Sequence, residues 1–146
     1  SIADYIARVG KGDCGMQGLL FITMCRIAGV PAKWQSGIYS QPGDEIGAHD
    51  WAQFYVPSVG WLFADLSFGS SAYRKGYEVN RKFYFGNMDP YRIPLNNQFQ
   101  KDFNPPKKHW RNDPCDNQYG EIEYDDAYLE KGTSDCSFTD RGIRLL

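Results

Sequence analysis

The stretch GDCGMQGLLFITMCRIAGVPA, residues 12–32, decides how the chain should fold. Apolar residues occupy most of its positions after the first few, which predicts a helix over 13–28 that is buried on most of its sides. Asp13 has the side chain of an N-cap residue, and Gly29 followed by Pro31 is a typical helix stop. The first expectation is therefore a buried helix that carries a cysteine in its first turn.

The residues on both sides of this helix predict further helix and strand. Apolar residues at helical spacing predict a helix over 1–10. After the central helix, short runs of apolar and aromatic residues predict strands over 32–39, 48–56 and 61–66. Pro, Ser, Val and Gly at 57–60 form a turn signal, so the last two strands should pair as an antiparallel hairpin.

Beyond Phe68 the sequence predicts less regular structure. Residues 83–85 are candidates for a fourth strand. Residues 87–120 are rich in Asn, Asp and Pro and contain five prolines, which predicts a long irregular stretch.

The length suits one ordinary domain. We expect a single domain over 1–146, with a core over about 1–86 and an irregular C-terminal extension over 87–146. The chain opens on Ser1, inside a helical pattern. We therefore expect it to be a fragment of a larger protein.

The composition excludes several classes of protein. Of 146 residues, 42% are hydrophobic and 23% are charged, which rules out a disordered tail. Sixteen Lys and Arg against eighteen Asp and Glu leave a net charge of −2, whereas a nucleic-acid binder needs a basic face. No apolar run approaches the roughly 20 residues that span a bilayer. We expect no nucleic-acid partner and no transmembrane segment.

Two of the four cysteines cannot pair with each other. Cys14 and Cys25 would lie about 16 Å apart along the expected helix, and a disulfide needs Cα atoms within about 7 Å. Cys115 and Cys136 can form a pair or remain two free thiols. No cysteine spacing fits a zinc site, so we expect no metal and no other cofactor. A redox or metal role for Cys115, Cys136 and His109 is the weakest alternative.

Cys14 lies where helix geometry favours a reactive thiol. Unpaired N–H groups and the positive end of the helix dipole stabilise a thiolate, so the pKa of Cys14 should fall below its free value of about 8.5. The same N–H groups can hold an oxyanion when a carbonyl is attacked. The alternative is a buried structural cysteine. Cys25, late in the same helix, should be a small core side chain.

A thiol nucleophile needs a base, and the chain has two histidines, His49 and His109. His49 lies on an expected strand, which holds a base more rigidly than the Pro-rich stretch around His109, so we favour His49. The expected hairpin brings Asp65 near His49, where a carboxylate can fix the imidazole tautomer. Asp50 is the rival acid, but as a strand neighbour of His49 it should point to the opposite face.

Three blocks of the sequence resemble the transglutaminase-like superfamily and its bacterial members. Residues 12–33 resemble its nucleophile helix, 48–56 its histidine strand and 60–65 its aspartate strand. The resemblance covers roughly 10–70. It implies an α+β, papain-like fold in which the nucleophile-bearing helix packs on an antiparallel sheet.

The same resemblance implies a role for each candidate residue. Cys14 would be the nucleophile, His49 the general base and acid, and Asp65 the acid that orients the histidine. Two features depart from the family. Only thirteen residues precede Cys14, so a family residue that helps hold the oxyanion is absent or lies elsewhere. No acidic cluster suggests the calcium sites of the animal enzymes.

These observations predict a thiol enzyme that attacks an amide carbonyl, in a peptide bond or a glutamine carboxamide, through a thioester. Water as the second nucleophile gives a cysteine peptidase or amidase, and an amine gives a transglutaminase. We favour hydrolysis or a mixed role on a protein or peptide substrate.

The alternative is a catalytically idle module that binds peptide or glycan in a larger surface protein, because 16% of the residues are aromatic. An extracytoplasmic location, in the periplasm or at the cell surface, fits this composition. The oligomeric state stays open.

Overall fold

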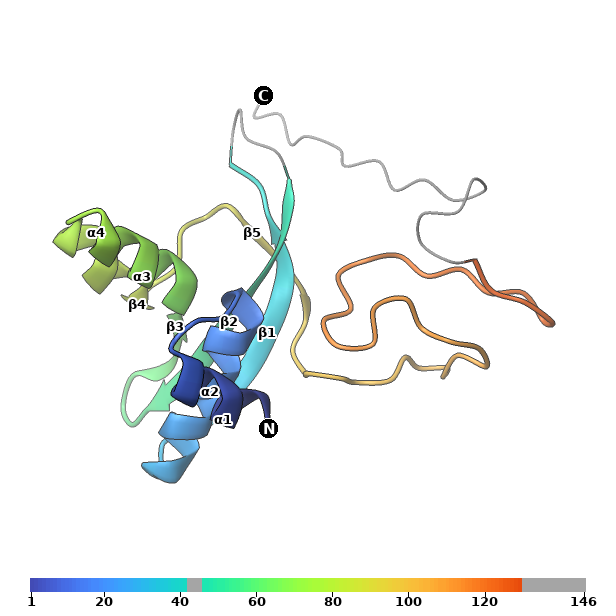
Figure 1. Ribbon diagram of the computed structural model, residues 1–146, viewed down its shortest axis with the longest axis horizontal. Helices are drawn as coiled ribbons and strands as arrows, with labels where there is room; N and C mark the ends of the chain where they lie inside the picture. Colours follow the sequence, from blue (N-terminus) through green and yellow to red (C-terminus); the bar gives the residue numbers. More distant parts are fainter. Residues whose placement is uncertain (42–45, 130–146) are drawn as a thin grey trace. The chain divides into compact units, whose positions relative to one another are not determined.

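A computed structural model describes residues 1–41 and 46–129 and shows an α+β fold (Figure 1). Its helices are α1 (Ile2–Val9), α2 (Cys14–Ile27), α3 (Leu66–Arg74) and α4 (Glu78–Phe83). Its strands are β1 (Ala32–Tyr39), β2 (Gly47–Val56), β3 (Gly60–Ala64), β4 (Phe85–Gly86) and β5 (Arg92–Asn96). They form one sheet in the order β4-β3-β2-β1-β5. The predicted class, helices with an antiparallel sheet, is confirmed.

The chain divides into two compact units. The first unit comprises Ser1–Gln35 and His49–Pro90, and the second comprises Ser36–Ala48 and Tyr91–Leu146. Strands β1 and β2 contribute residues to both.

Helix α2, in the first unit, begins and ends close to the predicted residues. The Asp13 carboxylate accepts the N–H of Met16 at 2.8 Å, as a side-chain N-cap does. Gly29 follows the helix with a φ of +76°, a conformation that favours glycine. Arg26 then donates two hydrogen bonds to the carbonyl of Ala32, at 3.2 and 2.9 Å. These bonds tie the first residue of β1 to the end of the helix.

One side of α2 packs on the strands, and the prediction of burial on most sides is wrong. Phe21 contacts Phe54 of β2 edge to face, with ring centroids 5.7 Å apart. Near the end of the helix, Met24 is 60% and Ile27 82% exposed. Cys25 is half-buried rather than part of the core. The error has a physical cause, because an apolar run does not show which of its sides another element covers.

Strands β2 and β3 form the predicted antiparallel hairpin. Ala52 lies opposite Ala64, and Val56 lies opposite Gly60. Gly60 has a φ of +108°, a backbone conformation that residues other than glycine rarely adopt. Because β3 ends at Ala64, Asp65 lies beyond the strand rather than near its end.

The hydrophobic core belongs to the first unit. Trp51 at 1% exposed is its largest fully buried side chain, and its indole N–H donates to Gln35 at 2.6 Å. Gln35 also accepts from Gln53 at 3.1 Å. The remaining buried hydrophobic residues are Ile6, Ile22, Ala32, Trp34, Ala52, Phe54, Ala64 and Ala72.

After Phe68 the first unit contains helix where the sequence predicts none. Phe83 ends α4, and of the expected strand 83–85 only Phe85 lies in a strand, the two-residue β4. Asp65 starts α3 by accepting the N–H of Phe68 at 2.9 Å. Helix α4 has only six residues, and α3 contains Gly69 followed by two serines, which weaken the helical signal of its sequence.

In the second unit, β5 pairs with the end of β1. Ser36 lies opposite Asn96 and Tyr39 opposite Arg92. A Cβ on Gly37 would lie 2.1 Å from the carbonyl oxygen of Ile93, so only glycine fits at this point of the pairing.

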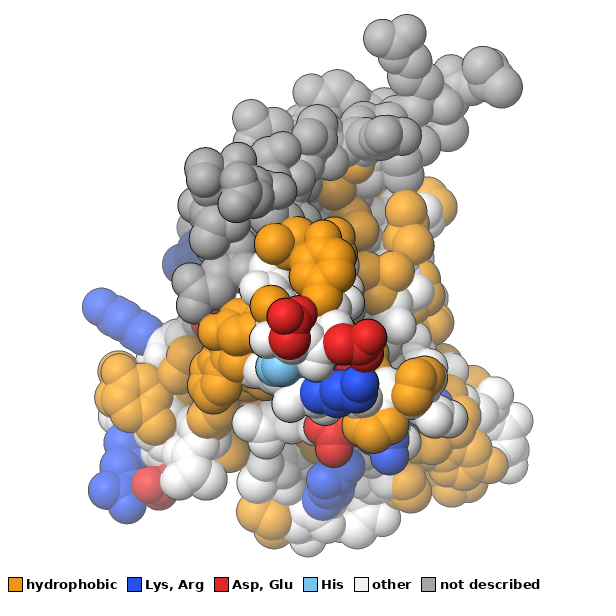
Figure 2. All heavy atoms as spheres, turned by 90° about the vertical axis from the view of Figure 1, so that its right-hand side faces the viewer, with side chains coloured by type: hydrophobic (Ala, Val, Ile, Leu, Met, Phe, Trp, Pro, Cys, Tyr) orange, Lys and Arg blue, Asp and Glu red, His pale blue; other side chains and the backbone are white. Residues whose placement is uncertain are grey.

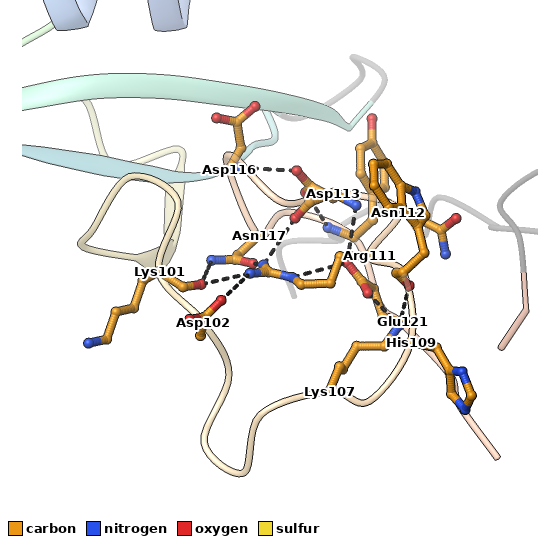
Figure 3. Close-up of polar contacts among 12 residues, drawn as sticks. Lys101, Asp102, Lys107, His109, Arg111, Asn112, Asp113, Asp116, Asn117 and Glu121 are labelled. Atoms are coloured by element: carbon orange, nitrogen blue, oxygen red, sulfur yellow. Dashed lines mark hydrogen bonds and ion pairs between the residues drawn. The ribbon is translucent and has the colours of Figure 1, made fainter. Parts of the chain in front are cut away.

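Polar side chains hold the irregular part of the second unit together (Figure 3). Lys107 and Glu121 form an ion pair at 2.7 Å, with side chains 8% and 2% exposed.

Arg111 donates to the carbonyl of Lys101 at 3.0 Å and to that of Asp113 at 3.2 Å. The Asp113 carboxylate accepts three backbone N–H groups, from Asp116, Gln118 and Tyr119. Side-chain hydrogen bonds here replace the ladders of regular structure.

Figure 2 shows one face of the molecule in which acidic and basic side chains lie beside one another among hydrophobic ones. The charges on this face are mixed in sign.

Candidate active site

The thiol of Cys14 lies at the first position of α2 and contacts a carboxylate. Its Sγ donates a hydrogen bond to Oδ2 of Asp50 at 3.5 Å. Cys14 is partly exposed, whereas Asp50 is 6% exposed. Among the described residues, Asp50 is the hydrogen-bond partner of the Cys14 thiol. No hydrogen bond joins the Cys14 thiol to His49 within this part of the chain.

The pKa of Cys14 moves in the direction opposite to the one predicted. Burial, together with the negative charge of Asp50, raises the pKa of Cys14 from 9.0 to about 12. A hydrogen bond from the Asp50 backbone lowers this pKa, but it does not offset the other effects, and the charge of Asp13 adds to the rise. The expectation of a pKa below 8.5 is therefore wrong. The helix end is present, but Asp13 occupies one of its N–H groups and two carboxylates lie near the sulfur.

His49 and Asp65 form the hydrogen bond that the sequence predicted. Nε2 of His49 lies 2.7 Å from Oδ2 of Asp65, and the two side chains are 10% and 0% exposed. The second carboxylate oxygen of Asp65 accepts from the Phe68 backbone and from the Ser67 hydroxyl, at 2.9 and 3.1 Å. Both oxygens of Asp65 are therefore fixed by hydrogen bonds.

An aromatic ring sets the plane of the imidazole. His49 stacks on Phe68 with ring centroids 4.8 Å apart and planes 24° apart. Because the Asp65 bond occupies Nε2, Nδ1 is the ring nitrogen that can exchange a proton with another group.

The start of α2 leaves no spare space around Asp50. A Cβ on Gly15 would lie 2.9 Å from Oδ2 of Asp50 and 3.1 Å from Cη2 of Trp34. A Cβ on Gly18 would lie 3.6 Å from the Trp34 ring, an ordinary contact. The close neighbours of these two glycines are therefore the side chains of Asp50 and Trp34.

Asp50 is the residue that sequence reasoning undervalued. It was considered only as a rival partner for His49, and strand alternation was expected to turn it away. It does contact a different group, the Cys14 thiol. The available signal was a carboxylate within a strand whose next residues, Trp51 and Ala52, are apolar, because a buried charge there requires a partner.

Two cavities border this group of residues in the first unit. One has a volume of about 310 Å³ and is lined in part by Asp65, Ser70 and Arg81. The other, about 470 Å³, is lined in part by Gly12 and Gln17 at the start of α2. Each cavity is therefore bordered by the candidate residues or by their close sequence neighbours.

The remaining candidates belong to the second unit or lie outside the described residues. The ring of His109 stacks on Tyr128 with centroids 6.2 Å apart. Cys115 is a free thiol, as are Cys14 and Cys25, and Cys136 lies outside the described residues. Over 1–41 and 46–129, no cluster of three His, Cys, Asp or Glu side chains is suited to a metal ion.

No helix in the described part of the chain is long and apolar enough to cross a membrane. This agrees with the absence of a long apolar run in the sequence.

Comparison with known proteins gives one match. Residues 1–66 match the family model of the transglutaminase-like superfamily. No curated protein and no solved structure matches the chain. The superfamily is in general one of enzymes, cysteine-based acyltransferases and peptidases, and the matched span includes Cys14, His49 and Asp65. Residues 1–66 are therefore similar to the transglutaminase-like superfamily.

Proposed function

We propose that the protein is a thiol-dependent acyl-transfer enzyme that attacks amide carbonyls, with Cys14 as nucleophile, His49 as base and Asp65 as the acid that orients His49. The observation that carries this proposal is the buried His49–Asp65 hydrogen bond of 2.7 Å. His49 precedes Asp50 on β2, and Asp50 contacts the Cys14 thiol at the start of α2. Nucleophilic catalysis by a thiol needs an imidazole that a carboxylate orients, and His49 with Asp65 supplies one on the strand whose Asp50 contacts Cys14.

The raised pKa of Cys14 determines how the first step proceeds. A thiol with a pKa of about 12 is almost entirely protonated at neutral pH. The proton therefore leaves during the attack rather than before it, and Nδ1 of His49 accepts it as general base. The sulfur forms its bond to the carbonyl carbon, and the carbonyl oxygen takes the negative charge.

Collapse of this intermediate gives the thioester. The carbon–nitrogen bond of the amide breaks, and the imidazolium returns its proton to the departing nitrogen. A second nucleophile, water or an amine, then attacks the thioester and gives its proton to His49. The acyl group leaves, and Cys14 regains its proton.

The start of α2 supports the charged intermediate. The backbone N–H of Cys14 belongs to the first turn, where N–H groups have no partner within the helix. Such groups stabilise an oxyanion. The cavity that Asp65 lines would accommodate part of the substrate.

Hydrolysis is the outcome that we favour, because each of the two cavities has charged side chains in its otherwise largely apolar lining. Ser70 and Arg81 border one of them, and Gln17, Lys11 and Arg74 border the other. A site that admits water gives hydrolysis of the thioester, whereas transfer to an amine requires that water be excluded.

A direct test uses an amide-mimicking electrophile and identifies the labelled residue by peptide mass spectrometry. We expect labelling at Cys14, with loss of label in His49→Gln at the same pH. Cys25 and Cys115 are free thiols in the same chain and serve as internal controls. Equal labelling of all three thiols, together with peptide or glycan binding that Cys14→Ala leaves unchanged, would instead indicate a catalytically idle binding module.

A further inference from the structure

The Asp50 carboxylate is built into the start of α2. It is 6% exposed, and its Oδ2 accepts the thiol hydrogen of Cys14 at 3.5 Å. The same oxygen lies 2.9 Å from the position of a Cβ on Gly15, so the helix approaches the carboxylate as closely as a glycine permits. The contact thus depends on two fixed elements, the first turn of α2 and the strand β2.

The charged groups around the sulfur come from three elements. Asp13, the N-cap of α2, supplies a second carboxylate, and Asp50 comes from β2. His49 on β2 is bonded to Asp65 at the start of α3. These groups favour a neutral thiol over a thiolate, since both nearby carboxylates are negative when ionised.

Two basic side chains line a cavity beside the start of α2. Lys11, between α1 and α2, and Arg74, at the end of α3, line the cavity that also borders Gly12. Both are exposed, so solvent screens their charges from the sulfur.

We propose that Asp50 is a positioning residue for the nucleophile: it holds Cys14 as a hydrogen-bonded thiol in the resting protein, and this bond must break before the thiol can reach His49. The inference rests on the proposed function for its meaning in catalysis. The Cys14–Asp50 contact itself does not depend on that function. In the step it describes, the S–H hydrogen bond to Asp50 is lost, and the proton then passes to Nδ1 of His49 as the sulfur bonds to carbon.

The consequence is a nucleophile that stays unreactive until a substrate rearranges the site. A neutral thiol reacts slowly with alkylating agents and oxidants, because the thiolate is the reactive form. Removing the negative charge of Asp50 should therefore make Cys14 react faster in the absence of substrate.

The test compares Asp50→Asn with Asp13→Asn by the rate at which iodoacetamide labels Cys14 at fixed pH. Asparagine keeps the size of each side chain and an oxygen that accepts a hydrogen bond. In Asp50→Asn we expect labelling on the order of tenfold faster, since each unit by which a thiol pKa falls raises its reaction rate about threefold. Asp13→Asn keeps the N-cap and should give a smaller increase. Cys25 in the same molecules should react at an unchanged rate.

Asp50→Ser serves as a second variant, because a smaller uncharged side chain should also accelerate labelling. Circular dichroism and the Cys25 rate show whether each variant is folded. Labelling of Cys14 that is no faster in either folded variant than in the unmodified protein overturns the inference.

Turnover is measured separately, as release of amine or ammonia from peptide and glutamine amides. Faster labelling in Asp50→Asn without any Cys14-dependent turnover in the unmodified protein would reject the proposed function and keep the inference. Cys14-dependent turnover with unchanged labelling in the Asp50 variants would keep the proposed function and reject the inference about Asp50.

Discussion

The two units of the chain bury different kinds of side chain. In the first unit the buried residues include nine hydrophobic ones, among them Trp34, Trp51 and Phe54. Among the described residues of the second unit, the buried side chains are polar or charged and include Ser36, Ser40, Lys107, Asp113 and Glu121. The first unit is therefore organised by apolar packing, and the second by hydrogen bonds and ion pairs.

Each unit also holds a buried ion pair or hydrogen-bonded pair at the same distance. His49 and Asp65 lie 2.7 Å apart, and so do Lys107 and Glu121. The first pair is held by a strand, a helix start and the ring of Phe68. The second pair is held by irregular chain. The His49–Asp65 pair therefore depends on the apolar framework around it, whereas the Lys107–Glu121 pair is itself part of the framework of its unit.

The largest expected effect is in the first unit, at the nucleophile. Cys14→Ala should remove turnover entirely, because Cys14 is the described thiol that lies at a helix start and contacts Asp50. Cys25→Ala, in the same helix, should leave turnover unchanged. The measurement is the rate of amine or ammonia release from peptide and glutamine amides. Turnover that survives in Cys14→Ala would contradict the proposed role.

The next effect tests how Asp65 orients the histidine. Asp65→Asn keeps an oxygen that can cap α3, but its amide N–H₂ can donate to Nε2 of His49. This would move the ring proton to Nδ1, which could then no longer accept the thiol proton. We expect turnover to fall about a hundredfold or more, within the range of general acid–base contributions.

The folding of Asp65→Asn is the control for this second prediction. Its thermal midpoint should stay near that of the unmodified protein, whereas Asp65→Ala should lower the midpoint because it also loses the N-cap. Equal loss of stability and turnover in the two variants would show a structural role alone.

The second unit should respond to loss of its buried ion pair without affecting the thiol. Glu121→Ala leaves the Lys107 charge buried without its partner, and such changes cost about 3–5 kcal/mol. We expect faster amide hydrogen exchange at Gln118 and Tyr119, whose N–H groups bond to Asp113 in the same network.

Asp125→Ala is the matched control, since Asp125 pairs with Lys108 at 3.1 Å but is fully exposed. It should leave hydrogen exchange unchanged. The labelling rate of Cys14 should be the same in both variants. A change in that rate in Glu121→Ala would break the distinction between the two units.

The same difference explains what the sequence could predict. The sequence predicts helix α2, strand β1 and the hairpin of β2 and β3. These elements are long or strongly patterned, and their apolar faces give a clear periodic signal. The pairing of His49 with Asp65 followed from the hairpin register alone. Helices α3 and α4 and the two-residue β4 were missed, because α3 contains Gly69, Ser70 and Ser71, which weaken a helical signal, and the other two elements are very short.

The errors at the site have another cause. The pKa of Cys14 depends on burial and on Asp50, which is 36 residues away in the sequence. Local helix geometry alone gave the wrong direction. In the second unit, the bonds that join Lys107 and Arg111 to partners up to 14 residues away carry no periodic signal.

A smaller effect should follow from adding a methyl group at Gly15, beside the Asp50 carboxylate. Gly15→Ala places a Cβ 2.9 Å from Oδ2 of Asp50 and 3.1 Å from Trp34. We expect a loss of about 1–3 kcal/mol in the free energy of unfolding, as for overpacked cores. Gly18→Ala, one turn later, meets only an ordinary contact and should be neutral or stabilising by up to about 1 kcal/mol. Chemical denaturation of both variants measures the difference, and equal effects would contradict the close approach of the helix to Asp50.

The smallest effect is expected at an exposed ion pair of the first unit, which sharpens the comparison with Lys107 and Glu121. Glu78 and Arg81 lie 2.6 Å apart on the surface of α4. The hydrogen bond from Arg81 lowers the pKa of Glu78 from 4.5 to about 2. The folded-state pKa is depressed, so any stabilisation is present above pH 4.5 and is lost as the pH falls towards 2. Because both side chains are in water, the energy is largely screened, and Glu78→Gln should leave the thermal midpoint at neutral pH unchanged within error. A drop as large as that in Glu121→Ala would show that distance, and not burial, sets the strength of these pairs.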